Sequence, residues 1–327
     1  MNIRRRRISG IAVAVAAALG LGTLSACAGD DTGTGGTDRF DVVASFYPMA
    51  FLAERIGGEH VNVTSLTQPG QEPHDLEVSA RQRARLEDAD AALHIKGLQP
   101  AVDEAISQSG IATKIDAGSL TTLVDAHHDD DHGDEGHGDE DHDGHDGHDG
   151  HDHGGTDPHL WLDPVRYAEV AEGVGRAFEK ADPGHAADYR KNTAALVKRL
   201  GELDTRFETG LRNTRTKVFI TTHAAFGYLA ERYGLTERAI SGLSPEAEPS
   251  AARVRDLQRT AKAEGVTTVF HETLVSDRTA RTVARDAGLR TDVLDPIEGI
   301  TEHSRGDDYL QVMESNLTAL QKALGAA

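Results

Sequence analysis

Residues 186–212 read AADYRKNTAALVKRLGELDTRFETGLR, and their pattern predicts one long helix. The stretch contains no proline, and side chains suited to burial recur every three or four residues, at Tyr189, Thr193, Leu196, Leu200, Leu203, Phe207 and Leu211. This spacing places them along one face of an α-helix. A helix over these 27 residues would be about 40 Å long, at about 1.5 Å per residue. We expect it to be a rigid connector between two halves of the chain.

Short apolar runs alternate with helical patterns on both sides of this connector. Such alternation predicts an α/β fold of two lobes, each with a mostly parallel sheet flanked by helices. The predicted strands are Val42–Phe46, Val61–Leu66, Ala91–Ile95, Val218–Thr222, Thr267–Phe270 and Asp292–Leu294. Helical patterns lie between these strands, for example at Ser79–Asp88, Ala224–Tyr233, Ser250–Glu264 and Ser276–Ala287, with serine N-caps at 79, 250 and 276 and closing glycines at 234, 265 and 288.

The length of 327 residues also favours two lobes over one. We expect an N-terminal α/β lobe over residues 40–180, a linking backbone helix within 181–214, and a C-terminal α/β lobe over 215–327. Residues 127–153 are expected to form a disordered His/Asp-rich loop inside the N-terminal lobe.

Residues 1–26 have the features of a signal peptide. Four arginines precede the uncharged apolar run Ile8–Leu24, and Leu24-Ser25-Ala26-Cys27 is typical of a bacterial lipobox, in which Cys27 is lipidated. Residues 27–39 are then a flexible tether, and the protein is expected outside the cytoplasmic membrane, anchored to its outer face. The alternatives are a cleaved signal peptide with an incidental free cysteine, or an uncleaved anchor helix. Cys27 is the sole cysteine, which excludes an intrachain disulfide.

Acidic residues outnumber basic ones, 54 to 34, which argues against nucleic acid or an anionic membrane surface as the partner. Residues 127–153 hold twelve of these acids and nine of the 17 histidines, and no apolar residue. Such a segment has nothing to bury, and its imidazoles make it a weak, multivalent binder of transition metals. The alternative is a solvated acidic linker with incidental histidines. The histidines of the tract are His127, His128, His132, His137, His142, His145, His148, His151 and His153.

Four other side chains lie just past predicted strands or in a proline-bounded turn, where parallel α/β sheets bind ligands. They are His74, His159, His223 and Asp295. Three imidazoles and one carboxylate suit Zn²⁺, whereas Mn²⁺ favours more carboxylates. Candidates to support a ligand or replace one are Glu72, Glu77, His271 and Glu272. Residues predicted to lie at the surface or in packing contacts are His60, His94, His185, His303 and Trp161.

Several short motifs occur in this order along the chain: Pro73–Glu77, Asp157–Pro164, His223–Tyr228, Ser244–Ser250 and Leu294–Pro296, with Tyr189 and Asn192 in the long helix. Together they resemble the metal-specific solute-binding lipoproteins of bacterial ABC importers, in their zinc branch. This resemblance implies a metal-type periplasmic-binding-protein fold, ligands at His74, His159 and His223, and Asp295 as the fourth ligand or a neighbour that water can replace.

The resemblance also implies a preference for zinc. Members of this family that bind manganese tend to carry a carboxylate at the position of His223. A His/Asp-rich loop just before the second histidine is typical of the members that bind zinc. The sequence departs from the family at Leu76, where an aromatic residue is usual, and in lacking a cysteine pair in the C-terminal lobe. Neither departure removes a ligand.

The function predicted from these features is capture of Zn²⁺ outside the membrane and its delivery to an ABC permease with a cytoplasmic ATPase. The protein is expected to be a monomer without catalytic turnover. One alternative is a manganese- or iron-binding importer component, and another is a surface metal buffer or adhesin with no transporter. A metallohydrolase is a weaker alternative, because the sequence has no His-Glu-x-x-His motif.

Overall fold

The computed structural model describes residues 39–124 and 156–326. The predicted signal peptide, the predicted lipidation site Cys27, the predicted tether up to residue 38 and the nine histidines of residues 127–153 lie outside the described residues. Among the described residues, no helix is both long enough and apolar enough to span a bilayer.

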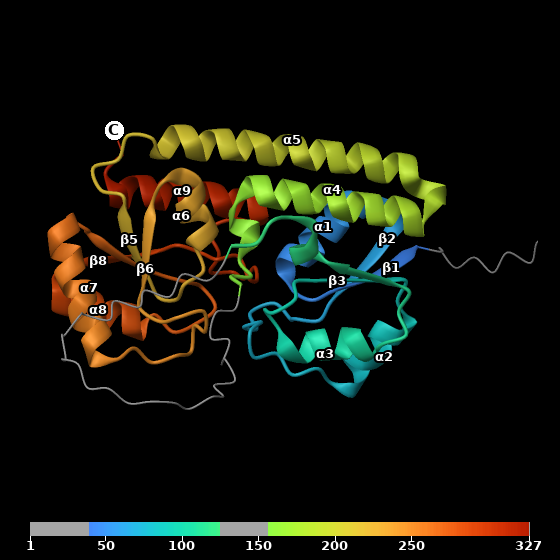
Figure 1. Cartoon of the computed structure of the whole chain (residues 1–327), viewed down its shortest axis with the longest axis horizontal. Helices are drawn as coiled ribbons and strands as arrows, with labels where there is room; N and C mark the ends of the chain where they lie inside the picture. Colours follow the sequence, from blue (N-terminus) through green and yellow to red (C-terminus); the bar gives the residue numbers. More distant parts are fainter. Residues whose placement is uncertain (1–38, 125–155, 327) are drawn as a thin grey trace, which may run out of the picture. The chain divides into compact units, whose positions relative to one another are not determined.

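The N-terminal half contains a four-stranded parallel sheet in the order β2-β1-β3-β4 (Figure 1). Successive side chains of a strand in this sheet pack against opposite faces of the sheet. Val42 joins the core under α1 and α4, whereas Val43 packs with residues of α2 and α3. The elements are β1 (Phe40–Ala44), α1 (Tyr47–Gly57), β2 (Val61–Ser65), α2 (Ala80–Asp88), β3 (Ala91–His94), α3 (Pro100–Gln108) and β4 (Thr113–Asp116).

The C-terminal half repeats this plan with a parallel sheet in the order β6-β5-β7-β8. Ile220 and Val269 face α7 and α8, while Phe219 and Phe270 face the opposite way, into the core that α9 shares. The elements are β5 (Val218–Thr221), α6 (Gly227–Tyr233), β6 (Thr236–Ala239), α7 (Ala251–Glu264), β7 (Thr268–His271), α8 (Arg278–Ala287), β8 (Arg290–Val293) and α9 (Tyr309–Leu324).

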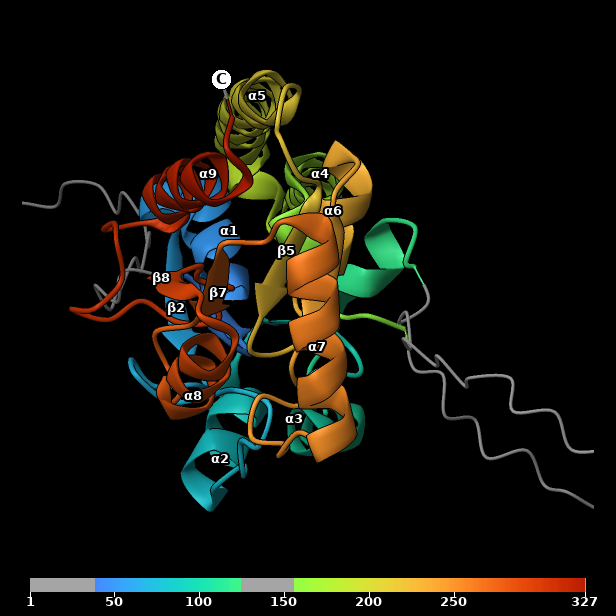
Figure 2. The same cartoon turned by 90° about the vertical axis from the view of Figure 1, so that its left-hand side faces the viewer.

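Helices α4 (Pro164–Ala181) and α5 (Ala186–Leu211) connect the two halves. Figures 1 and 2 show α5 running beside α4 and α9, which it contacts. All seven side chains that the spacing selected on α5 are buried. Six of them join one core cluster that includes Val42 of the first sheet and Phe219 of the second. Short 3₁₀ turns lie at Gly58–His60, Ala117–Leu120, Leu160–Leu162 and Pro183–His185.

The predicted α/β fold with a long connecting helix is confirmed. The serine N-caps at Ser79 and Ser250 are confirmed as well. The predicted glycines at 234, 265 and 288 close α6, α7 and α8 in the left-handed conformation. No closing glycine was predicted for α2, which ends at Ala89 in an extended conformation. Helix α8 begins at Arg278, so Asp277 and not the predicted Ser276 holds the N-cap position, although the Ser276 hydroxyl accepts the N–H of Arg278 at 3.4 Å. The lobe boundaries at residues 180 and 215 stay a prediction.

Candidate metal centre

Three imidazoles and one carboxylate converge at the carboxyl ends of the strands. His74 lies in the loop after β2, His159 precedes the turn that leads into α4, and His223 follows β5. The fourth residue is Glu298, in the loop after β8. One ligand atom from each of these four residues lies within 4.8 Å of the other three.

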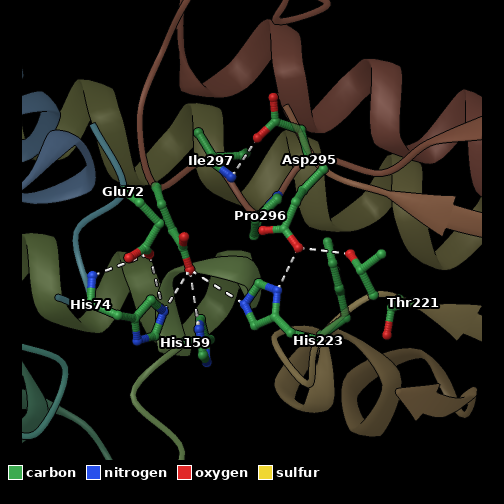
Figure 3. Close-up of polar contacts among 12 residues, drawn as sticks. Glu72, His74, His159, Thr221, His223, Asp295, Pro296 and Ile297 are labelled. Carbon is green, nitrogen blue, oxygen red and sulfur yellow. Dashed lines mark hydrogen bonds and ion pairs between the residues drawn. The ribbon is translucent and has the colours of Figure 1, made fainter. Parts of the chain in front are cut away.

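The Nε2 atoms of the three histidines surround one oxygen. Glu298 Oε1 is 3.1 Å from Nε2 of His74, 3.3 Å from that of His159 and 3.6 Å from that of His223. In Figure 3, dashed lines from the three labelled histidine rings meet at one unlabelled carboxylate oxygen, which the three distances identify as Oε1 of Glu298. These rings come from both halves of the chain, so neither half alone holds the complete set.

The group is buried except at one edge. His159, His223 and Glu298 are at most 1% exposed, and the side chain of His74 is 12% exposed. Buried ionisable groups without a partner are costly, so a cluster of this kind is usually paired or binds a metal. His74 is therefore the most solvent-accessible of the four residues.

Two further carboxylates orient the buried imidazoles. Asp157 Oδ1 is 2.7 Å from Nδ1 of His159, and Glu272 Oε1 is 2.8 Å from Nδ1 of His223. An ionised carboxylate only accepts hydrogen bonds, so Nδ1 of each ring carries the proton and donates it. The Nε2 atoms, which face Glu298, have no other hydrogen-bond partner in His159 and His223. This arrangement leaves Nε2 as the metal-binding atom.

The same carboxylates control protonation of the cluster. Burial lowers the pKa of His159, but the charge and hydrogen bond of Asp157 and the contact with Glu298 outweigh it and raise the pKa to about 9. For His223, Glu272 and Glu298 likewise outweigh burial and raise the pKa well above its usual value. Burial raises the pKa of Glu298, yet the three imidazoles hold it well below its usual range. Without metal the cluster is therefore an imidazolium–carboxylate network, and a binding cation must displace protons.

Asp295 is not part of the converging group. One carboxylate oxygen accepts the backbone N–H of Ile297 at 2.8 Å, and the other accepts the hydroxyl of Thr273 at 2.9 Å. Burial raises the pKa of Asp295 to about 6. The structure thus brings Glu298, three residues further on, among the imidazoles. Sequence reasoning missed Glu298 because it considered residues at the strand end and not the loop beyond; an acid soon after Asp295-Pro296 was the available signal.

The candidate supporting residues divide into two kinds. Glu272 orients His223, and Glu72 accepts the backbone N–H of His74 at 3.1 Å while its Oε1 lies 4.0 Å from Nε2 of that ring. Glu77 is exposed, and His271 at the end of β7 lies outside the group.

The remaining histidines of the described chain lie where the sequence placed them, away from the cluster. Three are paired with acids and one is exposed: His60 with Asp188, His94 with Asp103, His185 with Asp182, and His303 at the surface. Trp161 is fully buried and packs on Phe46, with ring centroids 5.0 Å apart. Its predicted packing role is confirmed.

The donor set matches the coordination chemistry of zinc. Imidazole nitrogen and a single carboxylate oxygen are typical Zn²⁺ ligands, and four donors satisfy a tetrahedral site. Mn²⁺ and Mg²⁺ prefer more oxygen ligands and a higher coordination number.

Known proteins that resemble this chain are also associated with zinc. The chain matches the family described as "Zinc-uptake complex component A periplasmic" (ZnuA) over residues 42–323. It is 35% identical over 290 residues to the zinc-binding lipoprotein AdcA of Streptococcus pneumoniae, covering 87% of this chain but 56% of that protein. It therefore spans little more than half of that relative. The high-affinity zinc uptake system protein ZnuA of Bacillus subtilis is 34% identical over 293 residues, covering 88% of each chain.

Solved structures agree with this match. The Zn(II)-bound ZnuA-like domain of S. pneumoniae AdcA superposes with a TM-score of 0.69 at 33% identity, covering 88% of this chain and 99% of that domain. The laminin-binding protein Lmb of Streptococcus agalactiae, described as an adhesin with metal transporting activity, gives a TM-score of 0.74 at 28% identity, covering 87% and 99%. The motifs, the fold and the family match agree, and this chain belongs to the ZnuA family of periplasmic zinc-uptake components, which are solute-binding proteins and not enzymes.

Proposed function

We propose that this protein is the extracytoplasmic zinc-binding component of an ABC importer. It captures Zn²⁺ between its two lobes and delivers the ion to a membrane permease. The observation that carries the proposal is the convergence of three imidazole Nε2 atoms and the Glu298 carboxylate within 4.8 Å. The ligands in this proposal are His74, His159, His223 and Glu298.

Zinc is the proposed cargo because of the number and type of donors. Three neutral imidazoles and one carboxylate leave a bound Zn²⁺ with a net charge of +1, compensated by the nearby Asp157 and Glu272. The names of the relatives AdcA and ZnuA, which refer to zinc binding and zinc uptake, support the same cargo.

The location and partners follow from the lipobox and the family. We propose that Cys27 is lipidated and holds the monomeric protein at the outer face of the cytoplasmic membrane, next to a permease with a cytoplasmic ATPase. The lobes would comprise residues 40–180 and 215–327, joined by the helix within 181–214. The word lipoprotein in the name of AdcA supports the anchor.

The test is a competitive metal titration of untagged protein that begins at Ala28 and lacks residues 127–153. We expect one tightly bound Zn²⁺ that excess Mn²⁺ does not displace. His74→Ala and His223→Ala should each abolish that tight site, because each removes one of four ligands. His94→Ala is the matched control, since this histidine pairs with Asp103 outside the cluster, and it should bind as the unaltered protein does.

Two results would contradict the proposal. Retention of full tight binding by His74→Ala or His223→Ala would show that the ligand assignment is wrong. Loss of all tight binding on removal of residues 127–153 would favour a surface metal buffer or adhesin. A growth defect of the deletion strain that only added zinc relieves would separate an importer component from that alternative.

A further inference from the structure

The residue before Glu298 has a backbone conformation that its side chain disfavours. Ile297 has φ +61°, and it is the only non-glycine residue with positive φ in the parts of the chain that the structure describes. A β-branched residue in the left-handed region is a clear outlier, because its Cβ crowds the following carbonyl oxygen. Ile297 is also fully buried, so something around it must hold this conformation.

The hydrogen bonds of the turn show what holds it. Asp295 Oδ1 accepts the N–H of Ile297 at 2.8 Å, which closes a turn from the aspartate side chain to the backbone two residues on. Figure 3 shows this bond between Asp295 and Ile297. The second oxygen, Oδ2, is fixed by Thr273 at 2.9 Å.

The rest of the turn is anchored from elsewhere in the fold. The side-chain amide of Asn316 on α9 accepts the N–H of Asp295 at 2.9 Å and donates to its carbonyl oxygen at 2.7 Å. The indole N–H of Trp161 donates to the carbonyl oxygen of Pro296 at 2.7 Å. The backbone groups of all three residues before Glu298 are therefore held by hydrogen bonds to side chains. The direction in which the chain continues to Glu298 depends on the backbone conformation of Ile297.

We propose that Asp295 is a positioning residue of the metal site, which holds Ile297 in the left-handed conformation and thereby places the Glu298 carboxylate among the three imidazoles. This inference rests on the proposed zinc-binding function and deepens it. Asp295 does not contact the ion, since both of its oxygens are engaged with Ile297 and Thr273. Without it, Ile297 relaxes to negative φ and Glu298 turns away, which leaves three imidazoles and an open position.

The experiment uses Co²⁺ as a probe in untagged protein from Ala28 that lacks residues 127–153. Four-coordinate Co²⁺ has intense visible absorption bands, which shift when one ligand is exchanged and weaken when the coordination number rises to five or six. Asp295→Ala should weaken Zn²⁺ and Co²⁺ binding about 10–100-fold, the usual cost of losing a residue that orients a ligand, and should change the Co²⁺ spectrum. Asp295→Asn keeps an oxygen that accepts the Ile297 N–H, and it should retain most of the affinity and the spectrum.

Second substitutions at Ile297 test the mechanism. Glycine adopts positive φ without the steric cost, whereas alanine does not. Asp295→Ala with Ile297→Gly should therefore recover part of the affinity and the Co²⁺ band positions and intensities of the protein with Asp295 intact, and Asp295→Ala with Ile297→Ala should not. Both double variants remove the same buried isoleucine side chain, so its lost packing cannot explain a difference between them.

Three outcomes would overturn the inference. If Asp295→Ala binds with unaltered affinity and spectrum, Asp295 does not position Glu298. If Asp295→Asn loses the site as fully as Asp295→Ala and glycine gives no recovery, Asp295 acts as a ligand. If the protein with Asp295 intact binds neither metal tightly, the proposed zinc function fails and this inference with it.

Discussion

Two buried carboxylates, Asp157 and Glu272, determine which nitrogen of their histidine faces the metal centre. Each accepts from Nδ1, at 2.7 and 2.8 Å, and leaves Nε2 directed at Glu298. Asp157 also accepts the backbone N–H of His159 at 2.9 Å, so it orients both the ring and its main chain. Neither carboxylate belongs to the converging group, yet both set its protonation and geometry.

Replacement of Glu272 tests this role at the level of one residue. Glu272→Gln keeps the size of the side chain and removes its charge, so the hydrogen bond to His223 weakens and the ring is less strongly oriented. We expect zinc affinity to fall about 10–100-fold in a competition titration. Glu77→Gln removes an exposed charge in the same protein and should leave the affinity unaltered. Equal affinities in the two variants would contradict the role of Glu272.

At the scale of single elements, the regularity of the side-chain pattern affects how well a segment can be predicted. The α5 spacing is regular over seven turns, and it predicted the helix to within one residue of its end. Strands β4 and β6 were missed because they lie at sheet edges and carry charged residues, as in Thr113-Lys114-Ile115-Asp116. Helix α4 was missed partly because it contains Gly173 and Gly175, which are poor helix formers.

Those two glycines have a tertiary explanation. A Cβ at Gly173 would lie 2.7 Å from the side chain of Leu120, and one at Gly175 would collide with Thr193 of α5. Glycine therefore allows α4 to approach α5 closely. The sequence pattern of α4 alone does not reveal this need, because Thr193 is 18 residues away.

The buried face of α5 makes a prediction about stability. Leu203 is fully buried in the core that contacts both halves of the chain. Leu203→Ala should lower the free energy of unfolding by about 2–5 kcal/mol, measured by urea denaturation of the metal-free protein. Arg199→Ala, at an exposed position of the same helix, should change it by less than about 0.5 kcal/mol. Similar losses in both variants would show that α5 is not held by this core.

At the scale of the whole molecule, Tyr228 links the residues on either side of the segment 125–155. Its hydroxyl accepts the N–H of Val124 at 3.1 Å and donates to the carbonyl oxygen of Asp157 at 2.8 Å. Asp157 N–H also donates to the carbonyl oxygen of Val124 at 3.2 Å. Because Asp157 orients His159, the fold brings the chain back to a fixed position beside the metal centre.

This closure predicts the effect of deleting residues 127–153. The ends already meet, so a shorter connection costs less closure entropy, and unfolding of the metal-free protein should require up to roughly 1–2 kcal/mol more. Thermal and urea unfolding of the two forms measure this. A large loss of stability on deletion would show that the tract contributes contacts to the fold. Tyr228→Phe is a useful companion, since it removes both hydroxyl bonds and should cost about 1–3 kcal/mol in either form.

The α/β alternation, the long helix and the three histidines could all be inferred from sequence because they depend on local rules. Helical and strand periodicity is a property of neighbouring residues, and the carboxyl ends of parallel strands meet at one edge wherever the sheet forms. The resemblance to zinc-binding lipoproteins rests on short motifs along the chain, three of which contain these histidines. These features needed no knowledge of distant contacts.

The fourth member of the cluster depended on the folded molecule. Asp295 and Glu298 are three residues apart, and nothing in that spacing says which carboxylate reaches the imidazoles. The choice is made by the left-handed turn at Ile297, which Asn316 and Trp161 stabilise from other parts of the chain. A backbone conformation that is unfavourable locally persists only where distant contacts compensate for it. For that reason the position of Glu298 emerges from packing between α9, the His159 segment and the loop after β8.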